Sequence, residues 1–319
     1  MIAATAGNPF PGARSPLTRA VRRSGSRKAV AHVRHSDCVA DVSQSVTRII
    51  SDVHFRDPAS WVQETSSLRP LLDGVNRMVV NGDLMDTQVL DEPAAVVSEL
   101  KSFFAANVPE TIYITGNHDP DISDLHEWSA RDGQVWLTHG DVLYDNVAPW
   151  GQLAGEIARR VQVHTARLSP GEFARIETRL RIFRQACLNL PREHDPSKRG
   201  LWAKLRRMAA ATFPPHRVLI MLAVWRAMPH RAAELARRQR SGARVIVMGH
   251  THAAGVWPQP DGRVVINTGS FCSPRGGQIV DLAEDAIRVR RLERRRGALR
   301  AGEVIAQHPL VPSPVSLPF

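Results

Sequence analysis

The chain has 319 residues, 43% of them hydrophobic, and is long enough to bury the core of one large domain or of a domain with an insertion. Its three cysteines are widely spaced and odd in number, which argues against a disulfide framework or a thiolate metal cluster and favours a reducing, cytoplasmic location. The formal net charge of +11 calls for an anionic partner, with nucleic acid, acidic lipid headgroups and phosphorylated metabolites all open.

Residues 1–45 form a basic N-terminal segment that we expect to be a disordered tail. This segment has no acidic residue before Asp37, while seven Lys and Arg stand among serines, alanines and prolines. The same composition resembles an organellar transit peptide, and the segment lacks the apolar stretch of a secretory signal. The folded domain is therefore predicted to begin at residue 46.

Six short runs rich in β-branched residues predict buried strands, because runs of this length bounded by Gly, Asn and Asp are typical of parallel sheets. They are residues 46–51, 77–80, 111–115, 135–138, 244–248 and 263–266. Residues 58–74 and 93–106 suit helices, so the pattern indicates an α/β fold. Polar clusters follow most of these runs and would lie at the carboxyl ends of the strands, where open α/β sheets gather their ligands.

After Trp150 the periodicity becomes helical, which predicts a helical insertion over residues 151–241. Ser169, Pro170 and Glu172 supply the N-cap, the first-turn proline and the capping-box acid of one helix. That helix would align four side chains on one face, namely Ile176, Leu180, Phe183 and Cys187. An earlier helix would carry three apolar residues at helical spacing, namely Leu153, Ile157 and Val161.

A further helix is predicted over residues 218–240, with an interruption or kink at Pro229. Its longest apolar run, residues 218–225, is much shorter than the roughly 18 to 20 residues that cross a bilayer, so we predict no transmembrane helix and leave peripheral membrane contact open. The insertion holds nineteen Lys and Arg against six Asp and Glu, and this balance of +13 exceeds that of the whole chain. Beyond Leu292 the sequence becomes Arg-rich and then Pro-rich, which predicts a loose tail over residues 294–319.

Five short clusters of polar residues carry the chemistry. In chain order they are Ser51-Asp52-Val53-His54, Asn81-Gly82-Asp83-Leu84-Met85-Asp86, Gly116-Asn117-His118-Asp119, His139-Gly140-Asp141 and Gly249-His250-Thr251-His252. Residues at i and i+2 of a strand that continues past the sheet edge point to the same side, so the Asp52/His54 and His250/His252 pairs can each face a common site. The glycines beside these residues permit close approaches that a Cβ would block.

Seven side chains of these clusters are candidate metal ligands: Asp52, His54, Asp83, Asn117, His139, His250 and His252. Four imidazoles, two carboxylates and one amide carbonyl, with no sulfur, suit manganese, iron or zinc. A carboxylate that bridges two ions holds them about 3.5 to 4 Å apart, the spacing at which two metals clamp a phosphoryl group. Asp83 is the candidate bridge.

These five clusters, in this order, resemble the calcineurin-like metallophosphoesterases over about 150 residues, from residue 46 to about 150 and again from 244 to about 291. The resemblance implies a β-sandwich flanked by helices, in four αββα layers. The domain would span residues 46–293 and would be interrupted by the helical insertion. Together the clusters are a highly specific signal, although each alone is weak.

The resemblance also implies how the ligands divide between two divalent metal ions, for which manganese is the first expectation and iron or zinc the alternatives. One ion would be held by Asp52, His54, Asp83 and His252. The other would be held by Asp83, Asn117, His139 and His250. His118 would act near the leaving group as a proton donor or charge stabiliser, and Asp86 would orient it. Asp119 stands where many members of the family have Glu.

The implied activity is hydrolysis of a phosphate ester or pyrophosphate by in-line attack of a metal-activated hydroxide, without a covalent phosphoenzyme. The substrate would be a phosphorylated small molecule or a lipid-linked nucleotide. A basic helical insertion at this place resembles that of the bacterial UDP-2,3-diacylglucosamine pyrophosphatases, in which it covers the acyl chains. Those enzymes usually have Arg at the position of His118, so their substrate is not carried over.

Two other functions stay open. A nuclease would use the basic insertion to track a phosphate backbone, but an aromatic content of 6% leaves little material for stacking bases. A non-catalytic scaffold would keep the fold alone, and such a protein has no physical reason to keep seven converging polar ligands.

Three further features carry two interpretations each. Asp141 is either a residue that supports the ligands or a helix cap or turn residue, and we leave it out of the predicted site. Residues 267–270 are either a segment near the metal centre or an ordinary strand-ending turn. Arginines of the insertion either clamp phosphate or form a solvated basic face, and no single one is nominated.

Overall fold

The structure is a computed structural model that describes residues 45–191, Trp202 and residues 213–310. These residues belong to one compact unit, and the basic tail expected over residues 1–45 lies outside the described residues except for its last residue. None of the described helices is long and apolar enough to cross a membrane.

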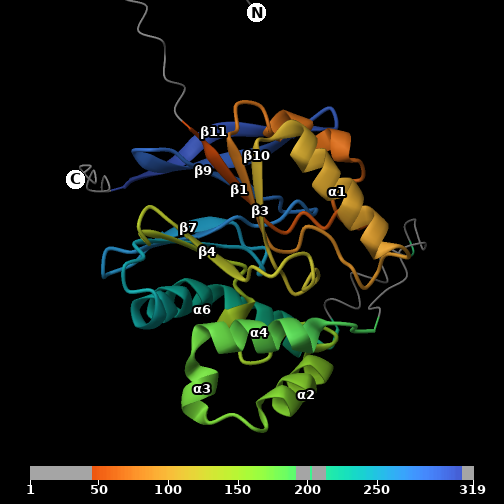
Figure 1. The fold of residues 1–319 in the computed structure, drawn as a ribbon, viewed down its shortest axis with the longest axis vertical. Coiled ribbons are helices and arrows are strands. Elements are labelled where there is room, and N and C mark those ends of the chain that lie inside the picture. Colours follow the sequence, from red (N-terminus) through yellow and green to blue (C-terminus); the bar gives the residue numbers. More distant parts are fainter. Residues whose placement is uncertain (1–44, 192–201, 203–212, 311–319) are drawn as a thin grey trace, which may run out of the picture. The chain divides into compact units, whose positions relative to one another are not determined.

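Two mixed sheets form the centre of this unit (Figure 1). The first has six strands in the order β11-β10-β9-β1-β2-β3, and the second has five in the order β4-β5-β6-β8-β7. The strands are β1 Thr47–Ile50, β2 Arg77–Asn81, β3 Glu110–Ile114, β4 Glu127–Ala130, β5 Val135–Thr138, β6 Val245–Met248, β7 Gly255–Pro258, β8 Val264–Asn267, β9 Gln278–Leu282, β10 Ala286–Arg295 and β11 Ala298–Pro309. The described helices are η1 Thr65–Leu71, α1 Pro93–Asn107, η2 Asp141–Leu143, α2 Ala154–Thr165, α3 Pro170–Ala174, α4 Ile176–Cys187 and α6 His216–Gln239.

All six predicted strands are confirmed, each within one residue of its expected bounds, as β1, β2, β3, β5, β6 and β8. Strands β1, β2 and β3 run parallel to one another, and so do β5, β6 and β8. Each sheet therefore gathers three carboxyl ends at one edge. The connections that follow these ends carry the five polar clusters.

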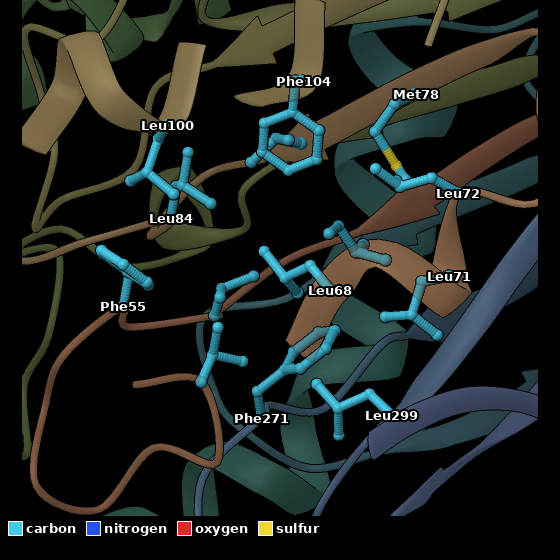
Figure 2. Close-up of a cluster of buried hydrophobic side chains, with 14 of the residues drawn as sticks. Phe55, Leu68, Leu71, Leu72, Met78, Leu84, Leu100, Phe104, Phe271 and Leu299 are labelled. Carbon is cyan, nitrogen blue, oxygen red and sulfur yellow. The ribbon is translucent and has the colours of Figure 1, made fainter. Parts of the chain in front are cut away.

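The alternation of side chains along the strands divides the core into layers. On the outer face of the first sheet, Leu100 and Phe104 of α1 point into a cluster of buried side chains (Figure 2). Ile49 of β1 and Val247 of β6 meet in a second cluster between the two sheets. On the outer face of the second sheet, Trp136 packs with side chains of α6. The fold is thus the expected four-layer arrangement of helix, sheet, sheet and helix.

The helix predicted over residues 58–74 is wrong in its first half, because only η1 is helical there. The preceding residues form a loop that distant parts of the chain hold in place. The Ser60 hydroxyl donates to the Val53 carbonyl at 2.6 Å. The Trp61 amide donates to the Phe271 carbonyl at 2.9 Å. Such long-range bonds impose an irregular path that periodicity along the sequence cannot reveal.

The described part of the insertion between β5 and β6 is helical after Leu153 (Figure 1). The helix predicted to begin at Ser169 has the expected capping box with Glu172, but it ends after one turn, since Arg175 is extended with φ −71° and ψ 131°. The break lets Phe173 of α3 fold back onto Phe183 of α4, with ring centroids 6.3 Å apart. One continuous helix would have kept these two rings about 15 Å apart.

Helix α6 is not interrupted at Pro229 but continues through it. A proline removes one hydrogen bond from a helix, and the packing of the buried side chains around it stabilises the helix nonetheless. Met228, Ala232 and Ala236 are buried in the same cluster as Trp136 of the second sheet.

The loose tail predicted over residues 294–319 is wrong as far as Pro309, and the rest of it lies outside the described residues. Strands β10 and β11 form an antiparallel hairpin that turns at Arg296 and Gly297, both with positive φ. Leu292 and Leu299 are buried on its inner face, while the arginines between them are exposed. The many arginines thus lie on the solvent face of an edge hairpin. Because they are so frequent, the alternation of buried and exposed side chains is hard to recognise in the sequence.

Candidate dinuclear metal centre

The five polar clusters meet where the carboxyl ends of the two sets of parallel strands converge. The clusters with Asp52, Asp83 and Asn117 follow β1, β2 and β3. The clusters with His139 and His250 follow β5 and β6. All seven predicted ligands lie within this one site, as the distances below establish.

The first set of side chains, which we call the Asp52 group, consists of Asp52, His54 and His252. One nitrogen or oxygen from each lies within 4.8 Å of the others. The Nε2 atom of His252 lies 3.2 Å from Asp52 Oδ1 and 3.2 Å from His54 Nε2. Two imidazole nitrogens that face each other beside a carboxylate fit a common cation.

The second set, which we call the Asp83 group, consists of Asp83, His139 and His250. One nitrogen or oxygen from each again lies within 4.8 Å of the others. His139 Nε2 lies 3.1 Å from Asp83 Oδ2 and 3.2 Å from Asn117 Oδ1. The same Asp83 oxygen lies 3.9 Å from His54 Nε2 of the Asp52 group. Asp83 thus stands between the two groups, and together they fit a dinuclear site.

Backbone carbonyls fix the orientation of two imidazoles. His139 donates from Nδ1 to the Asn81 carbonyl at 3.0 Å, which leaves Nε2 to face Asp83. His250 donates from Nε2 to the Val147 carbonyl at 2.9 Å, which leaves Nδ1 for the site. Hydrogen bonds of this kind set the tautomer of a metal-binding histidine and hold its ring. Asn81 and Val147 therefore support the centre without being predicted to do so.

The pKa values of the buried imidazoles differ in a way that bears on metal binding. Burial, together with the neighbouring histidines, lowers the pKa of His54 and of His250 to about 4, so both are neutral at pH 7. Burial also works against a charge on His139, but the Asp83 carboxylate outweighs it and raises the pKa of His139 to about 10. A metal must displace a proton to bind at His139, because only a neutral imidazole is a ligand.

Five of the seven predicted ligands have backbone φ angles in the left-handed region, with values of 51° for Asp52, 47° for His54, 54° for Asp83, 66° for His250 and 54° for His252. For residues with a Cβ this conformation costs roughly 1 to 2 kcal/mol each. Such strain is typical of functional sites.

The left-handed backbone also corrects the argument from strand alternation. Strand β1 ends at Ile50 and β6 ends at Met248, so neither pair of ligands extends from a strand in the assumed way. His250 and His252 in fact belong to different groups. The expectation that these side chains share one site is confirmed, but the reason given for it is wrong.

Two glycines allow the chain to pass close to the carboxylates. A Cβ on Gly116 would collide with the Asp83 carboxylate, and one on Gly249 would collide with the Asp52 carboxylate. The predicted role of glycine beside the ligands is confirmed at these positions.

Asp119, to which the sequence assigned no role, braces the backbone around Asp83. Its Oδ1 atom accepts hydrogen bonds from the amides of Asp83 at 3.0 Å and Gly116 at 2.8 Å. Its Oδ2 atom accepts from the Leu84 amide at 2.7 Å. Burial and then the Asp83 carboxylate raise the pKa of Asp119 to about 7. Its place as the last residue of the third cluster is the one sequence signal that could have indicated this role.

His118 and Asp86 lie together beside the Asp52 group. His118 Nδ1 lies 2.9 Å from Asp86 Oδ2, and the His118 ring centroid lies 5.2 Å from that of His54. The His118 amide donates to Asp83 Oδ1 at 2.9 Å. The side chain of His118 is 29% exposed and that of His252 is 39% exposed, so the centre opens to solvent at these two residues.

Asp141 is fully buried and forms an ion pair with Arg184, a residue of α4 in the insertion. Both guanidinium NH groups contact its carboxylate, at 2.7 and 2.8 Å. Arg184 lowers the pKa of Asp141 although burial opposes the charge. Asp141 thus supports the loop after His139. The sequence did not distinguish Arg184 from the other basic residues of the insertion, which number nineteen in all.

Residues 267–270 lie beside the metal centre, as one of their two interpretations predicted. The Asn267 side chain donates to the Gly249 carbonyl at 2.6 Å. The Thr268 hydroxyl contacts the Ser51 hydroxyl at 2.5 Å, next to Asp52. This segment therefore links the ends of β1 and β6.

Comparisons with known proteins agree with this arrangement. A family model described as calcineurin-like phosphoesterase matches residues 47–254. No curated protein matches the chain significantly.

Solved structures that resemble the chain include Vacuolar Protein Sorting 29 from Cryptosporidium parvum, with 14% identity, a TM-score of 0.39, and coverage of 84% of this chain and 98% of that one. A predicted phosphoesterase from Streptococcus pneumoniae has 13% identity, a TM-score of 0.37, and coverage of 84% and 98%. A dimetal phosphatase from Danio rerio has 13% identity, a TM-score of 0.37, and coverage of 77% and 95%.

Proposed function

This chain belongs to the calcineurin-like phosphoesterase family, and from that premise we propose that it is a dinuclear metal-dependent hydrolase of phosphate esters or pyrophosphates. The observation that carries the proposal is Asp83, one oxygen of which lies 3.1 Å from His139 and 3.9 Å from His54. A single carboxylate thereby joins two ligand groups, as a bridge between two ions would.

The seven predicted ligands would hold two divalent ions, with manganese as the first candidate and iron or zinc as alternatives. Such a pair of ions stabilises charge on a phosphoryl group as a Lewis acid and activates water. Asp83 would bridge the ions, and Asn117 would complete the Asp83 group with its amide oxygen.

His118 would donate a proton to the departing oxygen at the open side of the centre. Its Nδ1 atom faces Asp86, which leaves Nε2 to face the substrate. His118 lowers the pKa of Asp86 against the effect of burial, so this carboxylate stays ionised and keeps the imidazole in one orientation. Asp86 is thus a positioning residue.

The substrate that we propose carries an apolar or nucleotide portion next to its phosphate. A cavity of about 750 Å³ in the insertion supports this, with Val161, Phe173 and Val224 among its lining residues. Its wall includes Asn146, the neighbour of Val147, whose carbonyl holds His250. The cavity therefore borders the loop whose Val147 carbonyl holds His250, and it extends between the helices of the insertion.

The nuclease alternative gains no specific support from the described part of the insertion. Several of its arginines are already engaged within the chain, for example Arg159 and Arg160 with Glu156. These groups are less available to a phosphate backbone than the net charge alone implies.

The test is a substrate panel with the full chain and added manganese, with bis(p-nitrophenyl) phosphate as the diester and UDP-diacylglucosamine as the lipid-linked pyrophosphate. Turnover of at least one of them, abolished by a chelator and restored by manganese, supports the proposal. A protein that binds metal but turns over neither substrate would remove both branches and favour the scaffold alternative. A version without residues 1–45 should behave in the same way.

A further inference from the structure

An arginine and a tryptophan lie together beside the metal centre, on segments that none of the five clusters includes. The guanidinium carbon of Arg275 lies 3.9 Å from the ring centroid of Trp225. The Trp225 indole donates from Nε1 to the Thr251 carbonyl at 2.8 Å. Thr251 stands between His250 and His252, so a single indole ring separates the guanidinium from the backbone that carries two predicted ligands.

The tryptophan of this Trp225–Arg275 stack is held firmly by the insertion. Trp225 belongs to α6 and packs against the cluster that contains Val224 and Met228. The ring is only partly exposed, and its one polar atom is satisfied by Thr251. The indole is therefore a fixed surface rather than a mobile side chain.

The arginine is held from the opposite side by the loop that follows residues 267–270. In that loop the Phe271 amide donates to the Asp52 carbonyl at 3.0 Å. The Ser273 hydroxyl accepts a hydrogen bond from the indole of Trp61 at 2.8 Å. These bonds fix the loop relative to the Asp52 group, so the position of Arg275 depends on the same framework as the ligands.

The charge of Arg275 is available to a ligand. The residue is exposed, and among the described residues no ion pair engages it. Arg56 and Arg184, by contrast, each pair with a carboxylate. A guanidinium that stacks on an aromatic face keeps its N–H groups directed outward in its own plane, where they can bind two oxygens of a phosphate.

The most exposed predicted ligand is the chain neighbour of Thr251. His252 is the one predicted ligand whose side chain is more than a third exposed, at 39%, and it directly follows Thr251. A group bound beside His252 would thus lie one residue along the backbone from the carbonyl to which Trp225 bonds.

We propose that the Trp225–Arg275 stack binds a second anionic group of the substrate, adjacent to the phosphoryl group held at the metal centre. The site would then prefer compounds with two linked phosphates over those with one. This inference rests on the proposed function for its account of where the first phosphate binds, and it narrows the substrate class to pyrophosphate-linked compounds.

The experiment measures binding rather than turnover. Isothermal titration calorimetry of the manganese-loaded full chain compares α,β-methylene-ADP, which has two phosphorus centres and resists hydrolysis between them, with AMP, which has one. We expect the diphosphonate analogue to bind at least about tenfold more tightly than AMP. In Arg275→Ala the ratio of the affinity for α,β-methylene-ADP to the affinity for AMP should fall to about one, mainly because α,β-methylene-ADP binds more weakly. Arg275→Lys should retain part of the preference for α,β-methylene-ADP.

Two further variants test the ring beneath the guanidinium and the specificity of the arginine. Trp225→Phe keeps a ring beneath the guanidinium and should retain most of the preference, whereas Arg300→Ala removes an exposed arginine of β11 and should change neither affinity. Equal affinity of the unmodified chain for both compounds would overturn the proposal, and so would an unchanged ratio in Arg275→Ala. Failure of the unmodified chain to hydrolyse both bis(p-nitrophenyl) phosphate and UDP-diacylglucosamine would instead refute the proposed function, since the binding ratio does not depend on turnover.

Discussion

Charged side chains are placed differently in two regions of the molecule. The loops with the predicted ligands bury them, whereas the helical insertion exposes most of those that it pairs. In the loops, Asp52 and Asp83 are buried to 0% and 1% exposure and accept hydrogen bonds from backbone amides. In the insertion, charged pairs such as Glu234 with Arg238 lie on exposed helix surfaces. Exposed pairs contribute little to stability, whereas a buried carboxylate is destabilising unless partners surround it. The loops thus combine buried carboxylates with left-handed backbone at five of the predicted ligands, as is typical of a functional centre.

The insertion nevertheless reaches the centre at a few defined points. Arg184 of α4 pairs with buried Asp141, and Trp225 of α6 bonds to the Thr251 carbonyl. The contrast therefore divides the insertion into residues that support the centre and residues that only face solvent. Four experiments, taken from the largest expected effect to the smallest, test the metal centre and this division of the insertion.

Replacement of the shared carboxylate should have the largest effect. Asp83→Asn removes the charge that joins the two groups, so we expect loss of at least one metal ion per chain and a fall in kcat of at least about 10³-fold. Metal analysis and the diesterase assay measure the two effects. Asp73→Asn, an exposed acid, is the control and should behave like the unmodified chain.

Replacement of His118 should reduce turnover without emptying the centre. His118→Ala is expected to lower kcat by about 10² to 10⁴-fold, as the loss of a general acid does, while metal content stays nearly intact. His230→Ala, at a side chain that is 81% exposed, serves as the control. An unchanged kcat in His118→Ala would refute its role as proton donor.

Removal of the buried arginine should destabilise the fold. Arg184→Met leaves the Asp141 carboxylate buried and unpaired, which costs about 3 to 5 kcal/mol, and chemical denaturation would measure it. Arg238→Met removes an exposed arginine of the same insertion and should leave the unfolding midpoint unchanged. If both variants unfold alike, the division of the insertion into supporting and solvent-facing residues is mistaken.

Metal affinity should rise with pH. The raised pKa of His139, about 10, means that binding at the Asp83 group releases one proton at neutral pH, so affinity should increase up to about tenfold per pH unit below that value. Competition against a chelator of known affinity between about pH 6.5 and 8.5 measures the slope after correction for the chelator's own protonation. A corrected affinity that does not change with pH would contradict a protonated His139.

The ligands could be predicted from the sequence because their information is local. Asp52, Asp83 and His139 each follow a short apolar run, and the carboxyl ends of parallel strands meet at an edge whatever the rest of the chain does. Side-chain chemistry then limits the choice of metal. The six predicted strands follow from the same local patterns, whereas the four layers were expected from the family resemblance.

The parts that escaped prediction depend on contacts between distant residues. Nothing near Arg184 in the sequence separates it from other arginines, and only the approach of α4 to Asp141 assigns its role. The hairpin of β10 and β11 was hidden because its exposed face is dense in arginine. The left-handed backbone at Asp52 and His250 likewise results from how the loops pack against each other.

The measurement that tests the central claim most directly is the metal content of the unmodified full chain, purified under reducing conditions and loaded with manganese. Two buried ligand groups joined by Asp83 predict about two ions per chain, falling to one or none in Asp83→Asn. A chain that retains no manganese, iron or zinc would contradict the account, because its buried carboxylates and imidazoles would then have no cation to bind.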